Sequence, residues 1–177
     1  MYVVTGNDDV LAPNAKTGET LWERWSGIDQ KISTVCWGWL NRGLAMGEGM
    51  LFLGQLDANL LALDMKTGKE VWKSPIEDWR NGYGVTSAPL YYDGIVYSGK
   101  TGGDFGVRSR LTALDAKSGK ILWRWYTLPG LGEVGSDTCP GGDRSCNAGW
   151  RVDLEHPCPR SAACANLLRH RQLRTRL

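Results

Sequence analysis

The sequence predicts an all-β fold, a partial β-propeller of about three blades, from a repeated phrase, its spacing and the short alternating segments around it. The phrase ends an apolar strand, continues as Asp or Asn, any residue, Lys, Thr or Ser, and Gly, and reaches a tryptophan four residues past the glycine. Its copies end at Trp22, Trp72 and Trp123, about fifty residues apart. A strand, a tight turn and a strand at that period are typical of a propeller blade, a four-stranded sheet packed around a central channel.

The composition of the phrase explains its turn and its tryptophan. An Asp side chain accepts hydrogen bonds from the backbone two residues on, and Gly tolerates the positive φ that closes a short hairpin. Tryptophan brings a large apolar surface to the contact between adjacent blades, and its indole N–H needs a carbonyl where it is buried. We therefore assign the three tryptophans a structural role.

Short β-prone segments bounded by Gly, Asp or Asn predict further strands. These are residues 50–54, 60–63, 89–92 and 95–98, with Asp93 and Gly94 as a hairpin turn between the last two. No stretch of ten or more residues before Asp137 has a helical period.

Three blades do not close a propeller, so two sheet edges are expected to be left open. The chain either pairs with further copies or is a piece of something longer. The first residues, 1–5, already read as the inside of a strand, with no signal peptide before them, which favours a piece. No segment is apolar enough to predict a membrane span.

Composition changes near Thr138, which divides the chain into residues 1–137, the partial propeller, and residues 138–177, an unrelated tail. The tail holds seven of the thirteen arginines, both histidines, four of the five cysteines and no lysine, and its net charge is +4 against −2 for the rest. Arginine enrichment raises a nucleic-acid partner, but no motif or interleaved aromatic supports one. The cysteines raise zinc, but their spacings fit no closed site.

Three motifs in order resemble the quinoprotein alcohol dehydrogenases, the methanol, ethanol and haem-bearing enzymes that use pyrroloquinoline quinone (PQQ) and calcium. They are Ile-Ser-Thr-Val-Cys-Trp-Gly-Trp-Leu-Asn-Arg-Gly at residues 32–43, Thr-Ser-Ala-Pro at 86–89 and Gly-Gly-Asp-Phe-Gly-Val-Arg at 102–108. The resemblance runs from Met1 to about Asp137. It implies part of an eight-bladed propeller with PQQ in the central channel, between a tryptophan floor and a disulfide of neighbouring cysteines.

The resemblance implies a cofactor role for seven positions. Cys36 matches the first cysteine of that disulfide, but Trp37 stands at the second, so the disulfide cannot form here. Arg42 matches an arginine that reaches the cofactor's oxygens, a role that suits a fork-shaped, permanently charged donor. The other five matches are Thr86 and Thr101 for the PQQ carboxylates, Gly102 and Gly103 for close backbone approach, and Asp104 for calcium. Asp104 replaces the family's glutamate, and the shorter carboxylate predicts weaker metal binding.

The implied reaction oxidises a primary alcohol to an aldehyde and passes the electrons to a cytochrome c or a haem domain in the periplasm. In the family, the general base, the floor tryptophan and an asparagine calcium ligand lie downstream of the matching region, so this chain alone is expected to be inactive. The alternative is a non-catalytic propeller scaffold of the outer-membrane assembly type.

A frame shift explains the tail as well as the break in composition. Read one nucleotide later, residues 150–161 permit Gly-Ala-Trp-Thr-Trp-Asn-Thr-Pro-Ala-Leu-Asp-Pro, which resembles the family's next blade. Residues 168–172 likewise permit Tyr-Gly-Thr-Gly-Asn. A tail out of frame has no selected fold and is expected to be disordered. Sequencing the DNA across codons 134–150 tests this, since an intact frame would rule the shift out.

Overall fold

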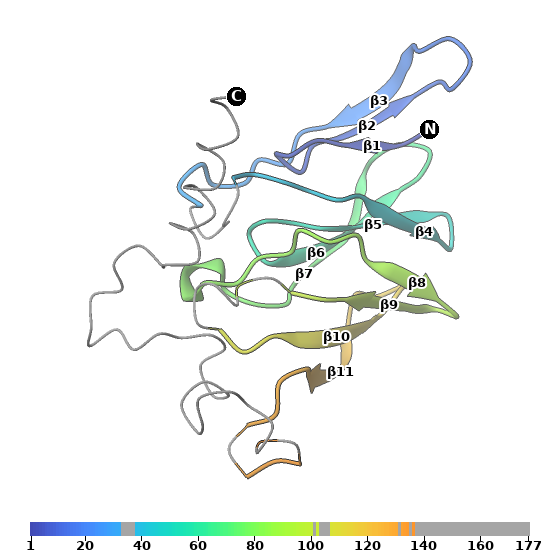
Figure 1. The fold of residues 1–177 in the computed structure, drawn as a ribbon. Coiled ribbons are helices and arrows are strands. Elements are labelled where there is room, and N and C mark those ends of the chain that lie inside the picture. The colour runs from blue at the N-terminus through green and yellow to red at the C-terminus, as the bar shows by residue number, and fades with distance from the viewer. Residues whose placement is uncertain (33–37, 101, 103–106, 131, 135, 137–177) are drawn as a thin grey trace, which may run out of the picture.

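The computed structural model describes residues 1–32, 38–100, 102, 107–130, 132–134 and 136, which form three antiparallel sheets (Figure 1). The first sheet has the order β1 (Val3–Val4), β2 (Val10–Pro13) and β3 (Thr20–Arg24). The second has the order β4 (Leu44–Gly47), β5 (Met50–Gly54), β6 (Asn59–Asp64) and β7 (Glu70–Pro75). The third has the order β8 (Leu90–Tyr92), β9 (Ile95–Ser98), β10 (Arg110–Asp115) and β11 (Ile121–Tyr126). One 3₁₀ turn, η1 (Trp79–Asn81), lies between the second and third sheets.

Each four-stranded sheet is an up-and-down meander, since its strands pair in chain order and every pairing is antiparallel. Figure 1 shows the three sheets following one another as successive layers, with the chain passing from one to the next. This is the arrangement of consecutive propeller blades, and it confirms the predicted fold class. The predicted strands at residues 50–54 and 95–98 have those bounds in the structure.

The turn of the repeated phrase has the predicted chemistry. The Asp64 Oδ1 atom accepts hydrogen bonds from the backbone N–H groups of Lys66, at 3.1 Å, and Thr67, at 2.8 Å. Gly68 then adopts a φ of +69°, a left-handed conformation that most side chains avoid. The hairpin turn predicted at Asp93 and Gly94 is also present, with φ values of +46° and +77°.

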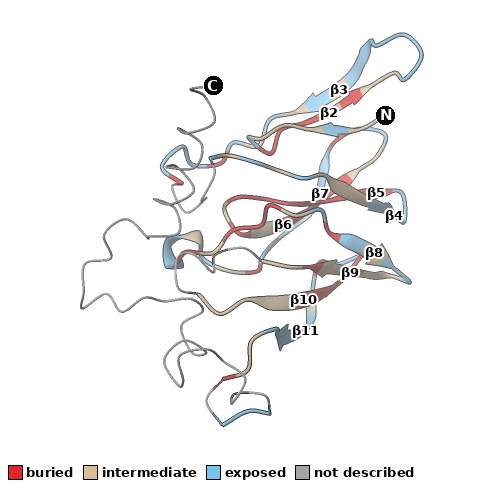
Figure 2. Cartoon of the chain, viewed as in Figure 1, coloured by how far each residue is buried: buried red, intermediate tan, exposed pale blue. Residues whose placement is uncertain are grey.

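The second sheet is buried on both faces because alternate residues of β5 and β6 point to opposite neighbours. Leu51, Leu53, Leu61 and Leu63 form a core with Val10 of the first sheet. Met50, Phe52, Leu60 and Ala62 form another with Val96, Leu114 and Ala116 of the third sheet and its turn. Figure 2 shows these buried residues in the middle of the stack. The two cores hold the three blades in a fixed order.

Two of the three repeat tryptophans join one blade to the next. The Trp22 indole N–H donates to the Met65 carbonyl at 3.2 Å, and the Trp72 indole N–H donates to the Ala116 carbonyl at 2.9 Å. Each ring also covers the turn glycine of the next blade, so that a Cβ atom on Gly68 would lie 2.5 Å from the Trp22 ring. The predicted structural role is therefore confirmed for these two. Trp123 is 43% exposed and has no carbonyl partner in the described part of the chain.

The predicted tail, residues 138–177, lies outside the described residues, so its separate character and its shifted frame stay predictions. In the part of the chain that the structure describes, no helix is long and apolar enough to cross a membrane.

Candidate functional site

Arg42 and Thr86 are joined by two hydrogen bonds, although they lie 44 positions apart in the sequence. The Arg42 backbone N–H donates to the Thr86 carbonyl at 2.9 Å, and the Arg42 Nη1 donates to the Thr86 Oγ1 at 2.6 Å. Arg42 precedes β4 and Thr86 precedes β8, which are the first strands of consecutive blades and contact each other. The structure thus brings two of the predicted cofactor residues together, at the entrance to the first strand of each blade.

The Asn41 side chain fixes the turn that presents Arg42. Its Nδ2 donates to the Asp8 Oδ1 and to the Gly54 carbonyl, both at 2.7 Å, and its Oδ1 accepts from the Gly43 N–H at 2.9 Å. Gly43 has a φ of +122°, which lets the chain reverse direction into β4. Three hydrogen bonds to three segments leave this turn with a single orientation.

Asp8 is a buried carboxylate behind this turn, and the sequence reasoning did not identify it. It is fully buried with a φ of +64°, and its Oδ2 accepts from the Leu56 N–H at 2.7 Å. Burial raises the pKa of Asp8 to about 6, although hydrogen bonds from Asn41 and Leu56 favour the charged form. Its place between Asn7 and Asp9 indicates a turn residue. The residues around Asp8 in the sequence do not indicate that its side chain bonds to Asn41, 33 positions away.

Gln55 adds a buried amide to the same region. It is fully buried, and neither its Oε1 nor its Nε2 has a hydrogen-bond partner in the described part of the chain. The Val85 N–H donates to the Gln55 carbonyl at 3.2 Å, so the segment that leads to Thr86 is bonded to the residue that follows β5. An unpaired buried amide is unfavourable by about 1–3 kcal/mol, which favours a site that supplies it with a polar partner.

Gly102 is the one described residue of the predicted Thr101–Asp104 group. Its φ is +131°, and a Cβ atom there would lie 2.3 Å from the Gly82 carbonyl oxygen and 2.5 Å from the Val107 Cγ2. The Val107 N–H donates to the Gly102 carbonyl at 3.4 Å. Only glycine fits this position, because of contacts within the chain. The predicted close approach of Gly102 to the cofactor stays a prediction.

The other predicted site residues lie outside the described residues. They are Cys36, Thr101, Gly103 and Asp104, together with Trp37. Among the described residues no three His, Cys, Asp or Glu side chains form a group that could hold a metal ion. The metal assignment of Asp104 and the cofactor assignment of these positions therefore stay predictions.

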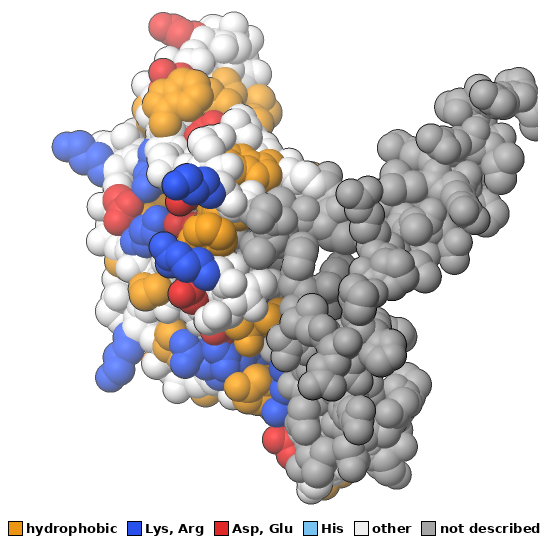
Figure 3. Space-filling model, turned by 90° about the vertical axis from the view of Figure 1, so that its left-hand side faces the viewer, with side chains coloured by type: hydrophobic (Ala, Val, Ile, Leu, Met, Phe, Trp, Pro, Cys, Tyr) orange, Lys and Arg blue, Asp and Glu red, His pale blue; other side chains and the backbone are white. Residues whose placement is uncertain are grey.

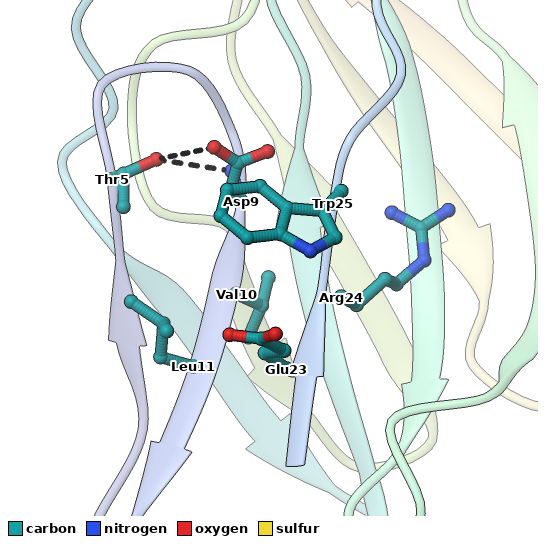
Figure 4. Close-up of a pocket in the computed structure, with 7 residues that line it drawn as sticks. All are labelled: Thr5, Asp9, Val10, Leu11, Glu23, Arg24 and Trp25. Carbon is teal, nitrogen blue, oxygen red and sulfur yellow. Dashed lines mark hydrogen bonds between the residues drawn. The ribbon is translucent and has the colours of Figure 1, made fainter. Parts of the chain in front are cut away.

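A small cavity of about 60 Å³ lies elsewhere, in the first sheet (Figure 4). Its residues are Thr5, Asp9, Val10, Leu11, Glu23, Arg24 and Trp25. The Asp9 carboxylate beside it accepts hydrogen bonds from the Ser26 N–H at 2.8 Å and from the Thr5 Oγ1 at 3.3 Å. These contacts tie the loop before β2 to the end of β3, so Asp9 has a structural role here.

Successive antiparallel meanders joined by the repeat tryptophans Trp22 and Trp72 define part of a β-propeller. The PQQ_2 family model, described as outer membrane protein assembly factor BamB, matches residues 6–138. The quinoprotein alcohol dehydrogenase PedH of Pseudomonas putida is 36% identical over 138 residues, 77% of this chain and 23% of that protein. The quinohemoprotein alcohol dehydrogenase of Comamonas testosteroni is 38% identical over 132 residues, 73% of this chain and 19% of that protein.

A solved structure, the europium-containing methanol dehydrogenase, superimposes with a TM-score of 0.70 at 34% identity over 76% of this chain and 24% of that one. The chain belongs to the PQQ_2 family and, within it, to the quinoprotein alcohol dehydrogenases. It spans about a fifth to a quarter of the length of these relatives.

Proposed function

We propose that this chain forms one wall of the PQQ site of a PQQ- and calcium-dependent alcohol dehydrogenase. The observation that carries the proposal is the pairing of Arg42 with Thr86 across consecutive blades, at 2.6 Å between Nη1 and Oγ1. A guanidinium offers five N–H donors, so one bond to Thr86 leaves several free for an anionic, oxygen-rich ligand.

The described residues fit such a ligand. PQQ is flat and bears carboxylates and carbonyl oxygens, which suit the charged fork of Arg42 and the hydroxyl of Thr86. Gly102 packs its backbone against the Gly82 carbonyl, where a Cβ atom would lie 2.3 Å from the oxygen, so it orders the neighbourhood of Thr101 without itself showing a ligand contact. The unpaired amide of Gln55, next to the Gly54 carbonyl that Asn41 binds, is a further polar group in this region.

When bound, PQQ supplies the two-electron acceptor for the hydride of the alcohol. Arg42 stabilises negative charge on the ligand's oxygens, and it is pre-oriented because its backbone and side chain are both bonded to Thr86. Asp8 and Asn41 act through the turn and keep that orientation. Asp104 is the position proposed to bind calcium, and Cys36, Thr101 and Gly103 are proposed to line the cofactor.

The proposed substrates are primary alcohols, which are oxidised to aldehydes. The acceptor is a cytochrome c or a haem domain, in keeping with relatives named quinohemoprotein alcohol dehydrogenase. The proposed compartment is the periplasm, where relatives of this class work.

Titration of the chain with PQQ in the presence of calcium, followed by tryptophan quenching, tests the proposal. Arg42→Lys should weaken binding about tenfold, because a lysine cannot reproduce the fork. Thr86→Val should weaken it less. Arg24→Lys is the matched control, since Arg24 pairs with Glu70 at 2.9 Å on the outer strands and should leave the affinity unchanged. Absence of saturable binding by the wild-type chain, or an Arg42→Lys affinity equal to wild type, would overturn it.

A non-catalytic scaffold is the second candidate, favoured by the description of the matching family model. A scaffold needs the blade cores and the tryptophan contacts between blades, but it has no use for a charged Arg42 held by Thr86 and by the Asn41 turn. The same titration separates the two, because a scaffold should bind no quinone with or without calcium.

A further inference from the structure

One carboxylate contacts both stems of the loop that connects β9 to β10. This loop, residues 99–109, carries the proposed cofactor and calcium positions Thr101 and Asp104. Lys100 stands at its beginning, and Arg110 is the first residue of β10 at its end. Both pair with the same oxygen, Oε1 of Glu77.

The three charged groups are buried together. Side-chain exposure is 1% for Lys100, 13% for Arg110 and 12% for Glu77. Removing the carboxylate would leave two buried cations facing each other, and uncompensated buried charges are strongly unfavourable. Glu77 therefore holds the two stems at one separation.

Glu77 itself belongs to the second blade. The backbone N–H groups of Ile76 and Glu77 both donate to the Ala58 carbonyl, at 3.2 Å each, and Ile76 is 1% exposed in the core between the second and third sheets. Ala58 follows β5, the strand whose end Asn41 binds through Gly54. Glu77 is thus anchored to the second blade, the same blade whose strand β5 holds the turn before Arg42.

The residues that follow Glu77 continue the contact with the loop. The Tyr83 ring lies 5.2 Å from the Lys100 Nζ, and the Gly82 carbonyl packs against Gly102. From the other side, the Arg110 Nη1 donates to the Tyr126 hydroxyl at 2.9 Å. The segment after β7 therefore contacts both ends of the loop: Glu77 and Tyr83 contact Lys100, and Glu77 also contacts Arg110.

We propose that Glu77 is a positioning residue that ties Lys100 and Arg110, at the two ends of the loop 99–109, to the second blade. The inference deepens the proposed function and rests on it for the role of Asp104 and Thr101. Glu77 acts through Lys100 and Arg110, because one carboxylate of the second blade holds both ends of a third-blade loop.

Hydrogen exchange of the full chain tests the clamp without any ligand. Glu77→Gln should make the peptides covering residues 99–110 exchange roughly tenfold faster, including the Val107 amide that donates to Gly102. Glu70→Gln is the matched control, because Glu70 pairs with Arg24 on outer strands and is 43% exposed. It should leave this loop unchanged.

Lys100→Met keeps most of the aliphatic stem and leaves the pair of Glu77 with Arg110, so it serves if Glu77→Gln does not fold. It should loosen only the first half of the loop. Terbium titration, read by tryptophan-sensitised luminescence, gives the second readout, since terbium(III) is a hard, oxygen-seeking cation like calcium. Glu77→Gln should weaken terbium binding about fivefold, with the Glu70→Gln value equal to wild type.

The two proposals fail in different ways. Faster loop exchange in Glu77→Gln, with no saturable PQQ or terbium binding by the wild-type chain, supports the clamp and overturns the proposed function. Unchanged loop exchange in both Glu77→Gln and Lys100→Met overturns the clamp, whatever the ligand titrations show. An equal effect of Glu70→Gln on the loop would also overturn it.

Discussion

The Asn41 amide lies between a buried carboxylate and the residue it presents: its Nδ2 is 2.7 Å from the Asp8 Oδ1, and Arg42 follows it directly in the chain. The conformation of the turn that presents Arg42 therefore depends on the buried Asp8 carboxylate. Because burial raises the pKa of that carboxyl to about 6, the dependence has a measurable pH signature.

Asp8→Asn should remove a pH-dependent part of the stability. A pKa raised from its ordinary value of 3.8 to about 6 means that the folded chain holds this proton more tightly than the unfolded chain. The contribution is fully present below about pH 4 and is lost as the pH rises to 6, and it amounts to roughly 3 kcal/mol. Urea unfolding at pH 4, 5, 6 and 7 should show this fall in wild type relative to Asp8→Asn.

Asp64→Asn is the contrasting variant for that experiment. Hydrogen bonds from Thr67 lower the pKa of the Asp64 carboxyl, so its contribution has the opposite sign. It is present above the unfolded pKa and lost as the pH falls through the folded one. The difference between wild type and Asp64→Asn should therefore stay nearly constant from pH 5 to 7 and shrink only as the pH falls toward and below 4. Parallel curves for wild type and Asp8→Asn between pH 4 and 6 would show that Asp8 keeps an ordinary pKa.

Trp72→Phe should destabilise the chain by about 1–2 kcal/mol, because it removes the hydrogen bond to the Ala116 carbonyl at 2.9 Å and part of the ring over Gly119. Trp123→Phe is the matched control and should change stability by less than about 0.5 kcal/mol, since its ring is 43% exposed. Equal losses in thermal unfolding would contradict the assignment of a blade joint to Trp72.

Gly102→Ala should cost more stability than Gly49→Ala. Both glycines have positive φ, +131° and +75°, so both substitutions introduce backbone strain. Only Gly102 also brings the new Cβ atom within 2.3 Å of a backbone carbonyl, whereas nothing lies within 4 Å at Gly49. We expect about 3 kcal/mol against about 1 kcal/mol in urea unfolding. A larger loss at Gly49 would mean that the loop stem moves aside freely.

The chain alone should turn over no alcohol. The groups that take the alcohol's proton and complete the metal site lie, in the family, downstream of the matching region. A dye-linked assay with PQQ, calcium and ethanol should therefore stay at the level of the protein-free blank. Turnover abolished by Arg42→Ala would show that the chain holds a complete site.

The parts of the fold that were predictable from the sequence are those that local chemistry determines. Turns such as Asp64 to Gly68 and strands such as residues 50–54 follow from hydrogen bonds and alternation within a few residues. The tryptophan joints were predictable because their spacing repeats. Arg42 and Thr86 were singled out by family resemblance, since no local rule links positions so far apart.

Asp8 and Glu77 could not have been found in this way. An aspartate in a polar turn and a glutamate after a strand are usually solvated, and composition offers nothing against that interpretation. Their burial follows from the packing of one blade on the next, which brings Leu56 to Asp8 and both Lys100 and Arg110 to Glu77. Such contacts become visible only when the order and spacing of the blades are known.

The exposed hydrophobic side chains of β11 in the third sheet affect the solubility and the fluorescence of the purified chain. Leu122, Trp123, Trp125 and Tyr126 are 40–60% exposed along β11, and Figure 3 shows other hydrophobic side chains interspersed with lysines and arginines on one face. Purified material should self-associate as concentration rises and should bind dyes such as ANS. Water-exposed indoles also emit at longer wavelengths than sheltered ones. Quenching by the quinone is therefore best followed at the blue edge of the emission band, where Trp123 and Trp125 contribute least.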